Sequence, residues 1–258
     1  MMGKEVHTVP LLGTPLVITD YQGLLEAISD WSGRPASTAA EFCNTQVVTM
    51  RRSDPAFQEA TSRYDYFIPD GMPLVWCLRA MGVDLRDRVY GPTFLRHAMI
   101  NDQKLKHYFL GGSDLTSRKL IEKAHALSNG HFQVVGANSS YSKPADSPAI
   151  VAEINRLSPD VIWVGLGTPK QQQWIQDNKP IINRGVLLGV GFAFDVNAGT
   201  KRDAPLWVQR FGLTWLFRLS QEPRRLLTRY LKYNTLFLLY CLFDLTRYLA
   251  GRTRKDSV

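Results

Sequence analysis

Short apolar segments alternate with longer amphipathic segments through the second half of the chain. Buried strands are predicted at His107–Leu110, Phe132–Val135, Asp160–Val164 and Val186–Val190. Helices are predicted between them, for example over Ala149–Leu157, where Ser147 and Pro148 supply a cap and a first-turn proline. Strands that alternate with helices in this way predict right-handed crossovers and a parallel sheet.

The first hundred residues show the same elements less regularly. Ser53–Arg63 and Met72–Met81 are predicted as helices, and Tyr66–Ile68 is predicted as a short strand. Together these patterns indicate an α/β fold, a Rossmann-like parallel sheet flanked by helices. In such sheets ligands bind at the carboxyl ends of the strands, where the glycine-containing turns fall.

Near residue 205 the chain becomes aromatic, basic and helical. We therefore expect a core over residues 1–204 and a C-terminal helical appendage over residues 205–258. Residues 201–258 contain twelve Lys and Arg against four Asp and Glu, so they account for the whole formal net charge of +8. A neutral core argues against a nonspecific nucleic-acid binder, and no nucleic-acid partner is expected.

The appendage has the composition of a membrane-surface helix. Arg218, Arg225, Arg229 and Lys232 fall near one face if one helix runs through them, although Pro223 favours a new helix start. With neighbouring leucines and aromatics, such a helix suits an anionic membrane surface. The alternative is a helical hairpin packed on the core with a solvated basic face.

Cysteine usage and the apolar runs indicate a reducing compartment. The three cysteines are widely separated and form neither a disulfide framework nor a metal pair. The apolar run from Val9 to Ile18 is interrupted by prolines and does not resemble a signal peptide. Leu236–Phe243 is too short to span a bilayer, which requires about 20 apolar residues. We expect a cytoplasmic protein, peripheral on the inner face of the cell membrane.

A glycine-rich turn, Gly165-Leu166-Gly167, lies between a predicted strand and a predicted helix. Backbone N–H groups at such a helix start attract anions, and Lys170 would add a positive charge for a diphosphate. Equally, Thr168 and Gln171 form a T-x-x-Q capping box that needs no ligand. The turn matches neither a Walker loop nor a dinucleotide-binding fingerprint.

Two aspartates follow predicted strands and are candidates for chemistry. Asp70, between Pro69 and Gly71, is either a turn residue or a general base at a strand end. Asp195 is either a cap or a ligand for a ribose or a nucleobase.

The sequence predicts no metal site, because the five histidines have no metal-ligand spacing and no D-x-D pair occurs. Basic side chains would therefore have to neutralise a departing diphosphate.

An ordered series of motifs resembles one family. The motifs are Asn44, Ile68-Pro69-Asp70-Gly71-Met72, Arg88-Val89-Tyr90-Gly91, Phe109-Leu110-Gly111-Gly112, Gly165–Gln171, Gly189-Val190-Gly191 with Asp195, Lys201–Pro205, Gly212–Leu219 and Glu222–Arg225. In this order, and over residues 10–232, the chain is similar to the WecG/TagA/CpsF glycosyltransferases. Each motif is weak alone, whereas the ordered set is specific.

The resemblance implies an inverting, metal-independent glycosyltransferase that needs no cofactor. Such enzymes move a sugar from a UDP-sugar to a polyprenyl-diphosphate-linked acceptor in bacterial surface polysaccharide synthesis. It implies that Asp70 is the base and assigns the other site residues as follows: Asn44, Arg88 and Gln171 line the site, Tyr141, Gly191 and Asp195 match the nucleotide pocket, and Arg218, Arg225 and Arg229 belong to the appendage. A homo-oligomer is compatible with the sequence.

Two departures from the family pattern bear on substrate choice. Phe42 replaces a threonine two residues before Asn44, and Gln172 replaces an acid in the usual Pro-Lys-Gln-Glu sequence. The residues alone also leave two other function classes open. One is a nucleotide-cofactor-binding oxidoreductase, and the other is a non-catalytic membrane-surface adaptor.

Overall fold

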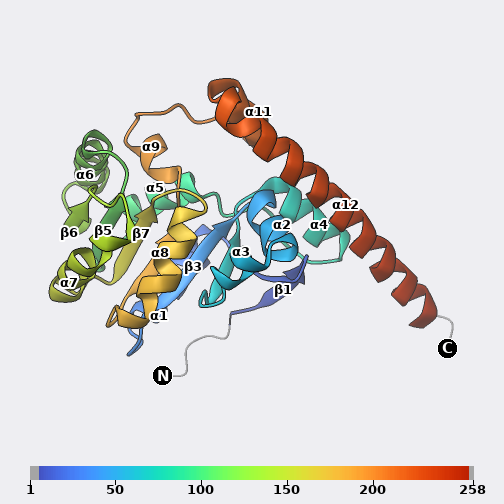
Figure 1. Ribbon diagram of the computed structural model, residues 1–258, viewed down its shortest axis with the longest axis horizontal. Coiled ribbons are helices and arrows are strands. Elements are labelled where there is room, and N and C mark those ends of the chain that lie inside the picture. Colours follow the sequence, from blue (N-terminus) through green and yellow to red (C-terminus); the bar gives the residue numbers. More distant parts are fainter. Residues whose placement is uncertain (1–5, 256–258) are drawn as a thin grey trace.

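The computed structural model describes residues 6–255, with side chains described through Asp244 and again at Thr246. One eight-stranded sheet lies between two helical layers (Figure 1). In spatial order the strands are β1 (Thr8–Leu11), β2 (Thr14–Val17), β4 (Tyr66–Pro69), β3 (Thr38–Cys43), β8 (Val186–Gly189), β7 (Val161–Gly165), β5 (Lys106–Gly111) and β6 (Gln133–Asn138). All neighbours are parallel except β1 and β2, so the predicted α/β class is confirmed with a mixed sheet.

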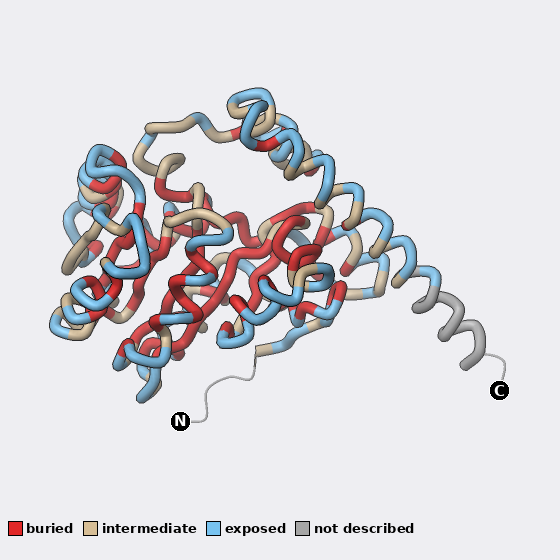
Figure 2. Tube along the Cα trace, viewed as in Figure 1, coloured by how far each residue is buried: buried red, intermediate tan, exposed pale blue. Residues whose placement is uncertain are grey.

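Helices cover both faces of the sheet and bury one stripe each. The first layer contains α2 (Thr45–Ser53), α3 (Pro55–Glu59), α4 (Met72–Ala80), α7 (Ser147–Leu157) and α8 (Lys170–Asn178). The second contains α1 (Tyr21–Ser32), α5 (Gly91–Asn101), α6 (Asp114–Ser128) and α9 (Ala193–Asn197). Two short 3₁₀ turns, Pro144–Asp146 and Lys179–Ile181, precede α7 and follow α8. Figure 2 shows that burial is concentrated in the strands and in the helix faces turned toward them.

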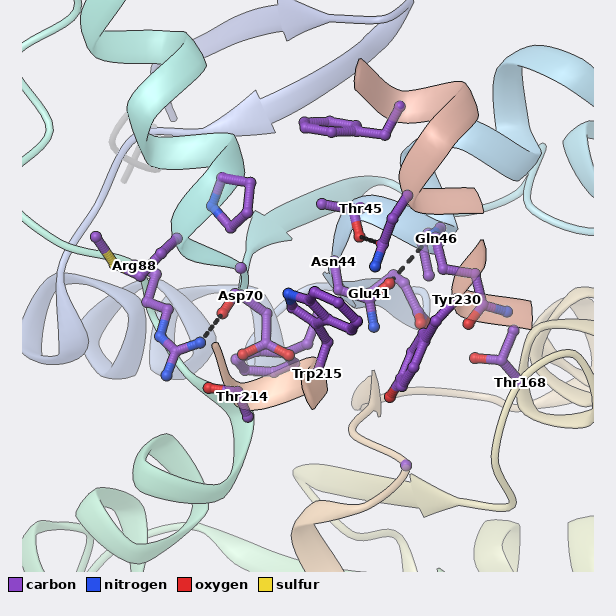
Figure 3. Close-up of a pocket in the computed structure, with 18 of the residues that line it drawn as sticks. Glu41, Asn44, Thr45, Gln46, Asp70, Arg88, Thr168, Thr214, Trp215 and Tyr230 are labelled. Atoms are coloured by element: carbon purple, nitrogen blue, oxygen red, sulfur yellow. Dashed lines mark hydrogen bonds between the residues drawn. The ribbon is translucent and has the colours of Figure 1, made fainter. Parts of the chain in front are cut away.

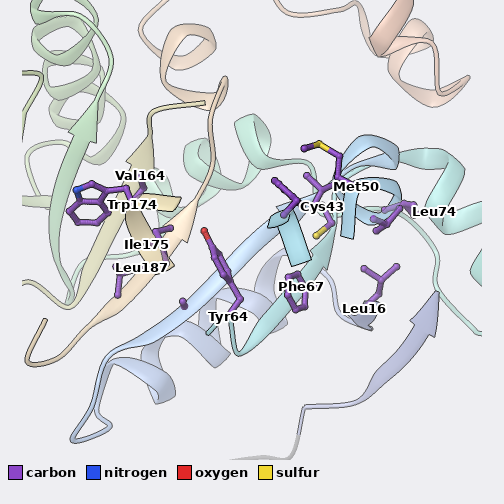
Figure 4. Close-up of a cluster of buried hydrophobic side chains, with 14 of the residues drawn as sticks. Leu16, Cys43, Met50, Tyr64, Phe67, Leu74, Val164, Trp174, Ile175 and Leu187 are labelled. Atoms are coloured by element: carbon purple, nitrogen blue, oxygen red, sulfur yellow. The ribbon is translucent and has the colours of Figure 1, made fainter. Parts of the chain in front are cut away.

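Two apolar cores result because strand side chains alternate between the faces. On β3, Cys43 points into the first core, whereas Phe42 points into the second. On β7, Ile162 and Trp163 divide in the same way. Figure 4 shows the first core, in which Trp174 of α8 is buried against the sheet. Burial on both faces explains why these strands read as short continuous apolar runs.

The predicted strands are confirmed, and the differences lie in the first half of the chain. The helix predicted over Ser53–Arg63 is confirmed only as the shorter α3, which starts at Pro55 and ends at Glu59, and α2 before it was not predicted. Asp54 separates them with an extended backbone, which the following proline favours, and its carboxylate caps α3. The β1–β2 hairpin was not predicted, and its turn is made by Leu12 and Gly13, both at positive φ.

Three helices follow residue 205: α10 (Leu206–Arg210), α11 (Thr214–Gln221) and α12 (Pro223–Lys255). Pro223 does start a new helix, so Arg218 lies on α11 and does not share a helix with Arg225, Arg229 and Lys232. None of the described helices combines the length and the hydropathy needed to cross a membrane.

Helix α12 lies against α2 at the carboxyl edge of the sheet (Figure 1). Thr45 Oγ1 donates a hydrogen bond to Asn234 Oδ1 at 3.0 Å. Farther along, Arg52 binds both carboxylate oxygens of Asp244, at 2.5 and 3.0 Å. Phe237 is 3% exposed and joins the first core, so the appendage packs on the core through part of α12.

Candidate functional site

A cavity of about 1060 Å³ lies at the carboxyl ends of β3, β4, β7 and β8, and α11 and α12 form its outer wall (Figure 3). It brings together nearly all of the predicted site residues: Asn44, Asp70, Arg88, Lys170, Gln171, Gly191, Asp195, Arg218, Arg225 and Arg229. These residues come from eight different turns and helices. The shared location follows from parallel strands, whose carboxyl ends meet at one edge of the sheet.

Tyr141 is the predicted site residue that does not line this cavity. It follows β6 at the far edge of the sheet and packs its ring edge-on against Trp174 at 6.5 Å. The structure therefore separates Tyr141 from the other ten candidates.

Asp70 is held between β3 and the segment that leads into α5. Its backbone N–H donates to the Cys43 carbonyl at 2.7 Å, and its Oδ1 accepts from the Gly91 N–H at 3.1 Å. Among the described residues, Oδ2 has no hydrogen-bond partner. Burial raises the pKa of Asp70 to about 6, although Arg88, the Gly91 N–H and Arg218 each oppose the rise. A carboxylate with this pKa changes charge close to physiological pH, which suits a general base.

Arg88 ties the Asp70 turn to the appendage. Its guanidinium donates to the Asp70 carbonyl oxygen at 3.2 Å and to Gln209 Oε1 of α10 at 3.1 Å. It also stacks over the Tyr90 ring, 4.2 Å from the centroid. Arg88 is only 7% exposed, and its planar guanidinium group holds the Asp70 backbone in place. The position of that backbone in turn sets the orientation of the Asp70 carboxylate.

Asn44 stabilises the start of α2 at the edge of the cavity. As the N-cap of α2, its Oδ1 accepts from the Val47 N–H at 3.2 Å. Among residues 6–255, the Nδ2 group of Asn44 makes no hydrogen bond. Asn44 can therefore cap α2 and donate a hydrogen bond to a ligand in the cavity at the same time.

Glu41 is a site residue that the sequence analysis missed. It lies on β3, is 1% exposed, and lines the cavity beneath Gln171. Its Oε1 accepts hydrogen bonds from Gln171 Nε2 at 2.9 Å and from Gln172 Nε2 at 2.6 Å. Glu41 is the one charged residue in the buried strand Thr38–Cys43, and this feature of the sequence could have pointed to it. Gln172, at the position where the family resemblance leads us to expect an acid, thus binds a carboxyl group supplied by Glu41.

Glu41 is neutral over most of the physiological range. Burial raises its pKa to about 8, because the charged form loses its water shell, and the two glutamine amides only partly offset this. Gly189 makes the burial feasible, since a Cβ atom at that position would lie 2.1 Å from Glu41 Oε2. The base of the cavity therefore holds a protonated acid that orients two amides.

The alternative in which Thr168 and Gln171 form a capping box at the start of α8 is wrong. The Gln171 side chain is turned toward Glu41, and Thr168 Oγ1 instead accepts from Gln172 Nε2 at 3.2 Å. Lys170, at the first position of α8, is exposed and lines the cavity. The turn before α8 thus presents a helix start and a mobile ammonium group to any anion in the cavity.

Asp195 belongs to a chain of ion pairs that joins the core to α12. Its Oδ2 lies 3.2 Å from Lys201 Nζ, which lies 2.9 Å from Glu222 Oε1, and Glu222 also pairs with Arg225. The Asp195 Oδ1 accepts a hydrogen bond from Thr200 Oγ1 at 3.2 Å. Asp195 therefore stabilises both the turn that contains Thr200 and the ion pairs in the wall of the cavity.

Positive charge dominates the wall of the cavity. The basic side chains that line it are Arg88, Lys170, Lys201, Arg218, Arg225 and Arg229. Within the described part of the chain, no group of three or more His, Cys, Asp or Glu side chains could hold a metal ion. A leaving diphosphate would therefore meet cationic side chains and helix N–H groups in this cavity.

Two aromatic side chains of the appendage line the cavity. Trp215 of α11 and Tyr230 of α12 meet edge to face, with ring centroids 5.9 Å apart (Figure 3). Both line the cavity, and neither was singled out from the sequence. Their pairing depends on the bend between α11 and α12, which no local pattern specifies.

Residues 9–250 match the profile of the family described as "Glycosyl transferase WecG/TagA/CpsF family". Curated relatives bear the name "N-acetylglucosaminyldiphosphoundecaprenol N-acetyl-beta-D-mannosaminyltransferase". The protein of that name from Bacillus subtilis (strain 168) is 25% identical over 228 residues, which cover 87% of this chain and 86% of the relative. The one from Bacillus spizizenii is 28% identical over 184 residues, 70% of each chain. That from Staphylococcus aureus (strain MW2) is 26% identical over 188 residues, 71% of this chain and 72% of the relative.

Proposed function

The chain belongs to the WecG/TagA/CpsF family of glycosyltransferases, and from this premise we propose that it transfers a sugar from a UDP-sugar to a polyprenyl-diphosphate-linked sugar. The transfer inverts the anomeric carbon and uses no metal ion. The relatives' names, which specify a diphosphoundecaprenol acceptor, support the acceptor class. The observation that supports the chemistry most directly is Asp70, a carboxylate of raised pKa in a cavity with cationic walls.

In the proposed reaction Asp70 removes the proton from an acceptor hydroxyl group. The hydroxyl oxygen attacks the anomeric carbon from the face opposite UDP, and the bond between that carbon and the β-phosphate oxygen breaks. One displacement inverts the configuration, and the proton remains on Asp70 until solvent removes it. The Gly91 N–H and Arg88 keep Asp70 oriented for this step.

The leaving UDP carries the negative charge that develops in the transition state. Lys170 and the N–H groups at the start of α8 line the cavity, and so does Arg218 of α11. These groups would stabilise the diphosphate without a metal ion. Asp195 and Gly191 lie at the carboxyl end of β8, where the nucleoside would bind.

The acceptor class determines where the enzyme must work. A polyprenyl chain keeps its diphosphate at a membrane surface, so the cavity has to open toward the bilayer. We propose that α11 and α12 hold the enzyme on the inner face of the cell membrane as a peripheral protein. Exposed apolar side chains on both helices, such as Leu216 and Leu231, support this placement.

Replacement of Asp70 tests the proposed chemistry. Asp70→Asn keeps the size and the Gly91 hydrogen bond but cannot accept a proton, so transfer from a UDP-sugar should fall by about 10²- to 10⁴-fold. UDP release, measured with a prenyl-diphosphate-linked acceptor, gives the rate. Asp84→Asn, an exposed aspartate between α4 and α5 that does not line the cavity, is the matched control and should keep the wild-type rate. Near-wild-type turnover by Asp70→Asn would remove Asp70 from the mechanism.

Ligand binding and UDP release together separate the proposed transferase from the two other function classes, the oxidoreductase and the non-catalytic adaptor. Membership of a glycosyltransferase family overturns the oxidoreductase alternative. UDP should raise the Tm of the protein, whereas NAD(P) should not. A protein that binds UDP and lipid but never releases UDP from donor and acceptor together would be the non-catalytic adaptor instead.

A further inference from the structure

The cavity extends beyond the polar site as an apolar groove between α4 and α12. We call this part the α4–α12 groove, and its lining residues are Leu12, Trp76, Ala80, Leu238, Cys241 and Leu242. Leu238 and Leu242 are 67% and 64% exposed, so the groove is open along one side. It is continuous with the site around Asp70, since both belong to one cavity.

Polarity changes in a fixed order along the face of α12 that lines the cavity. Arg225 and Arg229 come first, Asn234 follows, Leu238 and Leu242 come next, and Asp244 ends the lined face. A helix rises about 1.5 Å per residue, so roughly 20 Å separate the Arg229 and Leu242 positions. One wall therefore offers cations next to the catalytic end and mainly apolar side chains from Phe237 to Leu242, before the Asp244–Arg52 ion pair.

The facing wall is built by α4 and is equally apolar. Trp76 and Ala80 lie one turn apart on α4 and both line the groove. Gly212 fixes the position of Trp76, because a Cβ atom there would lie 2.6 Å from the indole ring. Cys77 Sγ lies 3.4 Å from Cys241 Sγ, so α4 and α12 are in direct contact beside the groove.

We propose that the α4–α12 groove binds the isoprenoid chain of the acceptor next to its diphosphate, with Arg225 and Arg229 at the diphosphate. This assignment rests on the proposed function. The acceptor is an amphiphile whose charged head is followed by an apolar chain, and the lined face of α12 has the same order. A bilayer alone would leave the diphosphate at its surface, whereas the groove draws the sugar end toward Asp70. The open side lets the chain enter laterally from the membrane.

Acceptors of different chain length test the groove kinetically. In detergent micelles, the wild-type enzyme should use a long-chain prenyl-diphosphate sugar with a kcat/KM at least about tenfold above that of a short, water-soluble one, since apolar burial favours the long chain. Leu242→Glu and Ala80→Trp should remove most of this ratio by charging or filling the groove. Leu239→Glu is the matched control, because Leu239 is 57% exposed on the same helix but does not line the cavity.

The cysteines of the groove provide a binding measurement without mutation. Cys77 and Cys241 are partly exposed in the groove, whereas Cys43 is buried in the first core. A long-chain prenyl diphosphate should slow alkylation of both groove thiols by N-ethylmaleimide severalfold, and UDP should not. Cys43 serves as the internal reference for global unfolding.

The results of these experiments distinguish failure of the groove proposal from failure of the proposed function. Transfer without a chain-length effect and without thiol protection would overturn the groove and leave the proposed function intact. An equal loss of the ratio in Leu239→Glu would also overturn it, because contact of α12 with the micelle would then explain the effect. Absence of transfer to any prenyl-linked acceptor would overturn the proposed function itself.

Discussion

Gln171 donates a hydrogen bond from Nε2 to Oε1 of Glu41, over 2.9 Å, at the base of the cavity. The two residues are 3% and 1% exposed. With its nitrogen committed to Glu41, Gln171 keeps Oε1 without a partner among the described residues, close to Gly191. The amide therefore presents an acceptor toward the cavity, and the orientation depends on a carboxyl group that burial keeps protonated.

Glu41 should make the stability of the protein depend on pH. Its pKa is about 8 in the folded protein and close to 4.5 when unfolded, so the folded state holds the proton more tightly. The stabilising effect of the neutral form is complete below pH 4.5 and is lost as pH rises toward 8. Glu41→Gln stays neutral, and its Tm should decline less than that of the wild type between pH 5.5 and 8. The difference should approach about 1.4 kcal/mol per pH unit at most.

Glu59→Gln is the matched control for this measurement, since Glu59 is exposed on α3. Its Tm should follow the wild-type curve at every pH. Parallel curves for the wild type and Glu41→Gln would mean that Glu41 is charged in the folded state, contrary to our interpretation.

Asp70 should impose an acid limb on the pH–rate profile. A base must be deprotonated to act, and the pKa of Asp70 is raised to about 6, chiefly by burial. The kcat/KM for transfer should therefore rise about tenfold per pH unit below 6 and become constant above about 7. The measurement is UDP release at saturating donor and at acceptor concentrations below KM, between pH 4.5 and 8.5, with Tm recorded at each pH. A profile that is level from pH 5 to 8 would show that a different group, or no group, accepts the proton.

Much of the fold could be predicted because local and tertiary preferences agree. The strands β5, β7 and β8 are buried on both faces, so each appears as an isolated apolar run with a glycine turn after it. The positions of Asp70 and Gly191 then followed from the shared edge of parallel strands. Helix α2 was missed because its residues Thr45–Ser53 include several Thr and Val residues, which favour a helix only weakly.

The remaining site features depend on contacts between distant segments. Glu41 is more than a hundred residues from Gln171, and only pairing of β3 with β8 brings them together. Trp215 meets Tyr230 because the chain bends at Pro223, and the α4–α12 groove exists because α12 docks on α2. Side-chain spacing within one segment holds no information on such contacts, so only the acid in an apolar strand was a usable signal.

Membrane attachment should depend on leucines that α12 exposes away from the core. Leu227 and Leu231 are 47% and 63% exposed and lie one turn apart, and the exposed Arg224 lies beside them in sequence. Full burial of a leucine is worth about 1.5–3 kcal/mol, so Leu227→Glu with Leu231→Glu should lower vesicle binding by roughly tenfold or more. Sedimentation with anionic vesicles measures this, and the Tm should stay unchanged because neither side chain is buried.

The arginines beside these leucines predict a dependence on charge as well. Wild-type binding should weaken with salt and on replacement of anionic by zwitterionic lipid, since screening removes the attraction of Arg224 and its neighbours. Leu115→Glu on α6 is a matched control, because Leu115 is 53% exposed on a helix of the second layer. Wild-type sedimentation of the double variant would place the membrane contact elsewhere. An equal loss in Leu115→Glu would mean that added negative charge, rather than the α12 surface, decides attachment.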